Sequence, residues 1–130
     1  MKNIAYWFLI ITVIAFFLYQ KGLIFTNFPS ITAEEASKLL KSDNNITLID
    51  VRTQKEFKED GYIKKSKLIP LGALQENLSK IDKSKKVLIY CRSGSRSISA
   101  ARLLEKNGFE VINLSGGINS WKSSGLDIKK

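Results

Sequence analysis

The sequence predicts an α/β fold: a parallel sheet flanked by helices on both faces, preceded by one N-terminal transmembrane helix. Short apolar segments alternate with helical segments between residues 31 and 130, which is typical of a parallel sheet. Residues 87–90 (Val-Leu-Ile-Tyr) are apolar without alternating polar positions, as expected for a strand covered on both faces. Residues 4–19 contain no charged side chain, which indicates a separate apolar helix at the start of the chain.

The N-terminal segment is expected to be an uncleaved single-pass anchor over residues 1–25 that contacts the membrane through residues 4–25. As a helix, residues 4–19 reach roughly 24 Å, and continuation to residue 25 spans the ~30 Å hydrocarbon core if Lys21 extends to the interface. The alternatives are a cleaved signal peptide, for which no convincing cleavage site is visible, and a buried core helix, which a ~100-residue domain could not enclose. The charges of Lys2 and Lys21 favour a catalytic domain outside the cytoplasm, on the periplasmic or extracellular side.

Residues 26–30, with Pro29, are predicted to form a linker, and residues 31–130 are predicted to form the domain. Thr32 and Glu35 have the spacing of a helix capping box, so a helix is expected over residues 33–40. The other helices are expected at residues 53–59, 74–78 and 97–107, and the strands at residues 46–50, 67–69, 87–90 and 110–113.

Cys91, the only cysteine of the chain, is the candidate catalytic residue. It follows one predicted strand and precedes a predicted helix, which is where open parallel sheets usually bind ligands. Loop amides, the helix dipole and two arginines are expected to favour the reactive thiolate. The loop residues expected to bind the substrate are Arg92, Ser93, Gly94, Ser95, Arg96 and Ser97. The alternative is a buried cysteine that only fills space in the core.

The spacing of this loop separates two chemistries. Cysteine-dependent phosphatases place an arginine six positions after the cysteine, where this chain has Ser97. Arg96 stands one residue earlier, so the loop is expected to be too small for a phosphate ester and better suited to sulfur carried on Cys91. A phosphatase or an arsenate reductase is therefore the less favoured interpretation.

The segment Cys-Arg-Ser-Gly-Ser-Arg-Ser from Cys91 to Ser97 resembles the active-site loop of single-domain rhodaneses, which are thiosulfate and persulfide sulfurtransferases. Further segments resemble the family's motifs in the same order, over about residues 30–128: Asp50-Val51-Arg52, Glu56-Phe57, Gly61-Tyr62-Ile63, Ile69-Pro70-Leu71, Gly116-Gly117 and Trp121. Tyr62 replaces a histidine that the family often has, and the chain contains no histidine. We expect little effect, because a thiolate that has already formed needs no imidazole base.

The resemblance implies transfer of sulfane sulfur through a Cys91 persulfide. The expected donor is a small anion such as thiosulfate or a persulfide, and the expected acceptor is a thiol, cyanide or a protein cysteine. A membrane-tethered sulfur carrier or binding module with little turnover is the alternative. No metal or cofactor is expected, because one cysteine without histidine does not suit zinc.

Asp50 and Arg52 also follow a predicted strand, but we interpret them as structural support for neighbouring loops. The chain carries a formal net charge of +9. Its lysines lie in scattered groups without interleaved aromatic residues, so no nucleic-acid partner is expected. They are interpreted as a solvated surface that can attract small anions.

Overall fold

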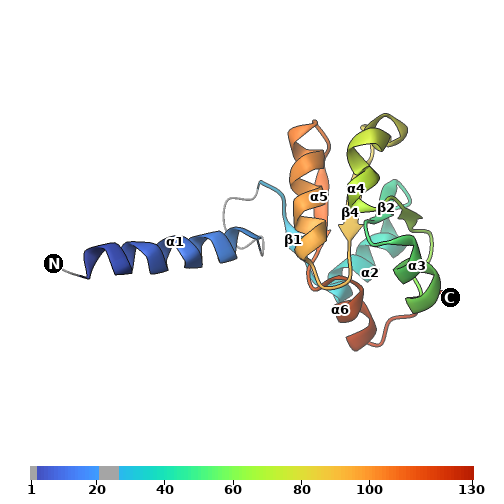
Figure 1. Cartoon of the computed structure of the whole chain (residues 1–130). Coiled ribbons are helices and arrows are strands. Elements are labelled where there is room, and N and C mark those ends of the chain that lie inside the picture. Colours follow the sequence, from blue (N-terminus) through green and yellow to red (C-terminus); the bar gives the residue numbers. More distant parts are fainter. Residues whose placement is uncertain (1–2, 21–26) are drawn as a thin grey trace.

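A computed structural model describes residues 3–20 and 27–130. Within these residues, parallel strands form one sheet in the order β1-β5-β4-β2-β3 (Figure 1). The strands are β1 (Ser30–Ile31), β2 (Ile46–Asp50), β3 (Lys67–Leu68), β4 (Lys86–Tyr90) and β5 (Val111–Leu114). The helices are α1 (Ile4–Gln20), α2 (Ala33–Ser42), α3 (Gln54–Asp60), α4 (Leu71–Leu74), the 3-10 helix η1 (Gln75–Lys80), α5 (Ser95–Lys106) and α6 (Gly117–Ser123).

The prediction of a parallel sheet with helices on both faces is confirmed. One apolar cluster joins the sheet to α4, η1 and α5, and a second cluster joins the opposite face to α2 and α6. The alternation of side chains along β4 feeds both clusters, since Val87 and Ile89 belong to the first, and Leu88 and Tyr90 to the second. This double burial explains why the sequence of β4 shows no polar alternation.

Two helices begin with the same cap. Thr32 caps α2 and forms the predicted capping box with Glu35. Thr53 caps α3 and forms a second capping box with Glu56. In each box the threonine hydroxyl accepts a hydrogen bond from a backbone N–H of the first turn, so the local sequence alone defines where the helix begins.

The described residues of the predicted linker contribute to the domain. Phe28 is 7% exposed and belongs to the cluster on the α5 face. The carbonyl of Pro29 accepts a hydrogen bond from the backbone N–H of Asn113, and Ser30 begins β1. Thr26 lies outside the described residues.

The prediction of a membrane-located chain is wrong. Helix α1 has 17 residues, and no helix in residues 3–20 or 27–130 is long and apolar enough to cross a membrane. The physical reason is length, because 17 residues rise only about 26 Å, whereas a hydrocarbon core is about 30 Å thick. Residues 21–25, with which the predicted span was completed, lie outside the described residues. The expected placement of the domain outside the cytoplasm is withdrawn with it.

Candidate active site

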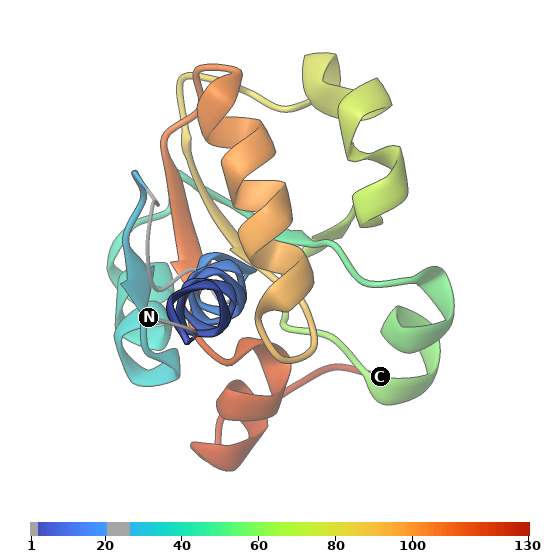
Figure 2. The same ribbon diagram turned by 60° about the vertical axis from the view of Figure 1, so that its left-hand side comes forward.

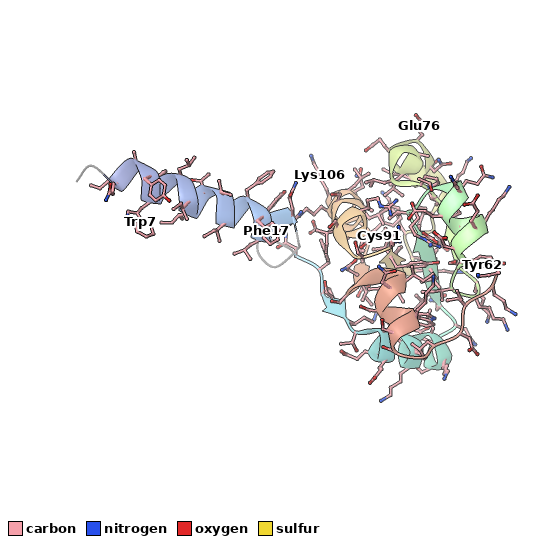
Figure 3. The ribbon with its side chains drawn as sticks, turned by 60° about the horizontal axis from the view of Figure 1, so that its bottom comes forward. Trp7, Phe17, Tyr62, Glu76, Cys91 and Lys106 are labelled. Atoms are coloured by element: carbon pink, nitrogen blue, oxygen red, sulfur yellow. The ribbon has the colours of Figure 1, made fainter. Side chains whose placement is uncertain are left out.

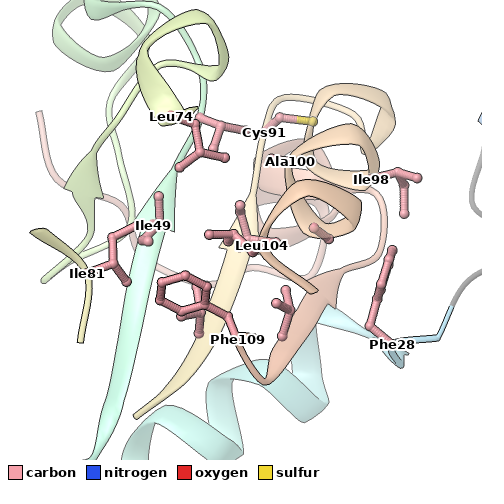
Figure 4. Packing of buried hydrophobic residues seen from close by; sticks show 14 residues of the cluster. Phe28, Ile49, Leu74, Ile81, Cys91, Ile98, Ala100, Leu104 and Phe109 are labelled. Atoms are coloured by element: carbon pink, nitrogen blue, oxygen red, sulfur yellow. The ribbon is translucent and has the colours of Figure 1, made fainter. Parts of the chain in front are cut away.

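Cys91 lies at the carboxyl end of β4, where the chain turns into α5. Gly94 makes this turn possible, because it caps α5 with a φ of 115°, a backbone conformation that side-chain-bearing residues rarely adopt. Cys91 is 1% exposed and belongs to the cluster on the α5 face. Figure 4 shows its side chain beside Leu74, with the sulfur directed toward α5. The structure thus brings the predicted nucleophile to the amino end of a helix.

A backbone N–H and a hydroxyl group form hydrogen bonds with the Cys91 sulfur. The Gly94 N–H donates to Sγ at 3.0 Å. The thiol donates to Ser97 Oγ at 3.5 Å, and the Ser97 hydroxyl donates to the carbonyl of Gly94 at 3.1 Å. Ser97 is fully buried, so this short network closes the loop from within. Among these bonds the sulfur accepts one, from the Gly94 N–H, and donates one, to Ser97 Oγ.

The guanidinium of Arg96 is held by a carboxylate from another element. Its Nη1 and Nη2 donate to Oε1 and Oε2 of Glu56 at 2.6 and 2.8 Å. The hydrogen bonds from Arg96 lower the pKa of Glu56 to about 2. The same pairing raises the pKa of Arg96. Arg96 therefore ties the first turn of α5 to the first turn of α3, an arrangement that sequence reasoning did not predict.

Glu56 was missed as a site residue, although its position carries a signal. The Thr53–Glu56 spacing is that of a capping box, which fixes the Glu56 carboxylate at the start of α3. Oε1 of Glu56 accepts from both the backbone N–H and the hydroxyl of Thr53. A carboxylate oriented by its own cap can present a bidentate acceptor to an arginine.

The remaining loop residues differ in exposure. Arg92 and Ser93 are exposed, whereas Gly94 and Ser95 are partly buried. The loop backbone rests on α6, because the carbonyls of Cys91 and Arg92 accept hydrogen bonds from two backbone N–H groups at the start of that helix, at 2.9 and 3.0 Å. A Cβ at Gly117 would stand only 2.4 Å from the carbonyl oxygen of Cys91. The glycine pair before Trp121 therefore permits close support of the loop.

Asp50 and Arg52 form a buried ion pair. Arg52 Nη2 donates to Asp50 Oδ2 at 2.6 Å and to the carbonyl of Gly61 at 2.7 Å. The two side chains are 0% and 1% exposed. The pair joins the end of β2 to the residue that follows α3, and Arg52 also lies 5.8 Å from the centre of the Tyr90 ring.

An open pocket of about 340 Å³ lies beside the loop. Its walls are formed by Phe17, Gln20, Leu71, Ser95, Arg96 and Ser99. Within the described residues, no group of three or more histidine, cysteine, aspartate or glutamate side chains is placed to hold a metal ion. The site thus combines a cysteine at a strand–helix junction, a backbone N–H that donates to its sulfur and a pocket beside the following helix turn, which together suit chemistry at sulfur.

A parallel α/β domain with a cysteine loop of this kind defines a class of thiol-dependent group-transfer proteins. The chain belongs to the rhodanese family, since the rhodanese-like domain model matches residues 32–124. A sulfurtransferase of Allochromatium vinosum is 37% identical over 99 residues, covering 75% of this chain and 92% of that protein. The thiosulfate sulfurtransferase GlpE of Coxiella burnetii is 38% identical over 97 residues, covering 74% of this chain and 89% of that protein.

A solved structure agrees with these relatives. The rhodanese-like domain protein of Staphylococcus aureus superimposes with a TM-score of 0.70 at 36% identity, covering 79% of this chain and all of that chain. The expectation of a single rhodanese-like domain is confirmed, and at the level of the family the chain is a sulfurtransferase homologue.

Proposed function

We propose that the protein transfers sulfane sulfur from thiosulfate or a persulfide to a thiol or cyanide through a persulfide on Cys91. The observation that carries this proposal is the 3.0 Å hydrogen bond from the Gly94 N–H to Cys91 Sγ, at the start of a loop that is one residue shorter than a phosphatase loop. A backbone donor at this position favours an anion on the cysteine in both steps of the reaction.

The first step loads the cysteine. The Cys91 thiolate attacks the outer sulfur of thiosulfate, a new S–S bond forms, and the bond to the central sulfur breaks as sulfite leaves with the electron pair. The hydroxyl of Ser97 now donates to the Gly94 carbonyl, and it can rotate to donate to the anionic sulfur instead. Backbone N–H groups of residues 92–97 then hold the terminal sulfur.

The second step transfers the terminal sulfur of the Cys91 persulfide to the acceptor. A cyanide ion or an acceptor thiolate attacks the terminal sulfur, the S–S bond breaks, and the Cys91 thiolate is restored. Because the enzyme carries the sulfur between two separate half-reactions, ping-pong kinetics are expected.

The two arginines of the loop receive different roles in this proposal. We assign Arg92 to the anionic donor and the leaving sulfite, and its exposure supports this role. Arg96 is already engaged by Glu56 at 2.6 Å, so we assign it a positioning role that holds the loop, in addition to its charge beside the substrate. Asp50 and Arg52 are assigned structural support.

The test follows both half-reactions in the full chain. Purified protein is given thiosulfate and then cyanide, and thiocyanate release and persulfide mass are measured for the wild type and Cys91→Ser. Thiocyanate release and a persulfide in the wild type, both absent in Cys91→Ser, would support the proposal. A stable persulfide without thiocyanate release would indicate a sulfur carrier and not an enzyme. Hydrolysis of an aryl phosphate that depends on Cys91 would overturn the proposal in favour of a phosphatase, and absence of all three signals would overturn the catalytic role of Cys91.

A further inference from the structure

Helix α1 contacts the domain at its carboxyl end. Arg102 of α5 donates to the carbonyl of Tyr19, and its guanidinium carbon lies 3.6 Å from the centre of the Tyr19 ring. Figure 2 looks along α1 toward α5, and Figure 1 shows that only the carboxyl end of α1 approaches the domain. In Figure 3, Phe17 lies at the end of α1 nearest the domain and Trp7 near the opposite end. The last turn of α1 is therefore attached to the helix that begins at the catalytic loop.

This attachment makes α1 part of the pocket beside the loop. Phe17 and Gln20 form one wall, and Ser95, Arg96 and Ser99 of α5 form another. Ser95 directly follows Gly94, whose N–H donates to Cys91 Sγ. The pocket thus lies against the first turn of α5, one residue after the glycine that donates to the sulfur, and Cys91 itself is buried beneath the loop.

The size and chemistry of the pocket indicate its ligand class. About 340 Å³ lies within the usual range of small-molecule sites and is far more than a cyanide or thiosulfate ion occupies. Phe17 and Leu71 supply apolar surface, and Gln20 and Ser99 supply hydrogen-bonding groups, while the charge of Arg96 is paired with Glu56. A small organic molecule with both a carbon skeleton and polar groups matches this lining.

We propose that Phe17 and Gln20 are specificity-determining residues that bind the organic part of a low-molecular-mass thiol, the acceptor of the sulfur. This inference rests on the proposed sulfur transfer. The acceptor thiolate attacks the terminal sulfur of the Cys91 persulfide, the S–S bond of that persulfide breaks, and an organic persulfide leaves while the Cys91 thiolate is restored. Cyanide has no organic part to bind, so its reaction does not need α1.

The experiment compares two acceptors in the full chain. Thiosulfate is the donor, and either glutathione or cyanide is the acceptor, for the wild type, Phe17→Ala and Gln20→Ala. Each substitution is expected to raise KM for glutathione about fivefold, since part of one apolar or hydrogen-bonding contact is lost. The kcat with glutathione should stay within about twofold, because the contact is made equally in the ground and transition states. With cyanide, kcat and KM should both stay within about twofold, because cyanide does not contact either side chain.

Phe16→Ala is the matched control, because Phe16 is a neighbouring exposed phenylalanine of α1 that does not line the pocket. Arg102→Ala removes the attachment of α1 and should raise KM for glutathione as Phe17→Ala does. Unchanged glutathione kinetics in Phe17→Ala and Gln20→Ala, with active cyanide transfer, would overturn this inference and leave the proposed function intact. Absence of sulfur transfer to cyanide in the wild type would overturn the proposed function itself. Sulfur transfer to the reduced cysteine of a protein, but not to glutathione, would overturn the inference and show that the acceptor is a protein.

Discussion

The two ends of α3 are each held by an arginine, in opposite surroundings. The Asp50–Arg52 pair and the Glu56–Arg96 pair both have an N···O distance of 2.6 Å. The first pair is 0% and 1% exposed, whereas the Glu56 and Arg96 side chains are 17% and 35% exposed. Solvent screens the second pair but not the first. An arginine–carboxylate pair should therefore determine stability at one end of α3 and the position of the Cys91 loop at the other.

The largest expected effect is on the buried pair. Arg52→Leu should lower the free energy of unfolding by about 3–5 kcal/mol, because it leaves the Asp50 carboxylate buried without its partner. Urea denaturation at pH 7 measures the loss. Lys86→Ala is the control, since Lys86 lies 3.9 Å from Glu110, is 47% exposed and should cost less than ~1 kcal/mol. Equal losses in the two variants would contradict a structural role for Arg52.

The second prediction concerns the backbone contact between α6 and the Cys91 loop, which holds the loop together with the Glu56–Arg96 pair. Gly117→Ala places a Cβ 2.4 Å from the Cys91 carbonyl oxygen at a φ of 59°. We expect a loss of about 1–3 kcal/mol in stability from overpacking. We also expect at least a ~10-fold loss in kcat/KM for sulfur transfer to cyanide, because displacement of the loop misplaces Cys91. Gly125→Ala is the control, since its φ is 77° but nothing lies within 4 Å of its Cβ. Loss of activity in both variants alike would point to general strain instead of loop displacement.

The third prediction separates activity from stability at the exposed pair. Glu56→Gln keeps a side-chain acceptor for the Thr53 cap but removes the charge that holds Arg96. Stability should fall by less than ~1 kcal/mol, while kcat for transfer to cyanide should fall about tenfold because the loop is less firmly positioned. Glu35→Gln is a matched control, since Glu35 occupies the same place in the capping box of α2. An unchanged kcat in Glu56→Gln would show that the pair does not position the loop.

Whether a contact could be predicted from the sequence depends on how far apart the two contacting residues lie in the chain. The position of Cys91 between a strand and a helix follows from neighbouring residues, and so does the cap formed by Thr32. The Glu56–Arg96 pair joins residues 40 positions apart, and no local pattern shows that α3 and α5 meet there. From the sequence we expected Arg96 to bind the substrate, and its pairing with Glu56 could not be predicted.

The N-terminal region shows the same limit. Strand β1 has only two residues, so its place in the sheet depends on pairing with β5 and leaves almost no sequence signal. The apolar composition of residues 4–19 suggested a membrane span, but no helix among the described residues is long and apolar enough for one. The contact of Tyr19 with Arg102, 83 positions away, could not be read from either segment alone.

The smallest predicted effect uses pH to test the exposed pair directly. Hydrogen bonds from Arg96 lower the pKa of Glu56 from its ordinary 4.5 to about 2 in the folded protein. As pH falls, the unfolded chain therefore binds the Glu56 proton first, and the stability that this carboxylate contributes above pH 4.5 is lost progressively toward pH 2. The difference in free energy of unfolding between the wild type and Glu56→Gln should be constant near neutral pH and shrink below pH 4.5, as measured by urea denaturation across this range. In an Arg96→Gln background the same difference should lose most of its pH dependence, because the lowered pKa depends on Arg96. A pH dependence that persisted in that background would assign it to the capping box of α3 instead of the ion pair.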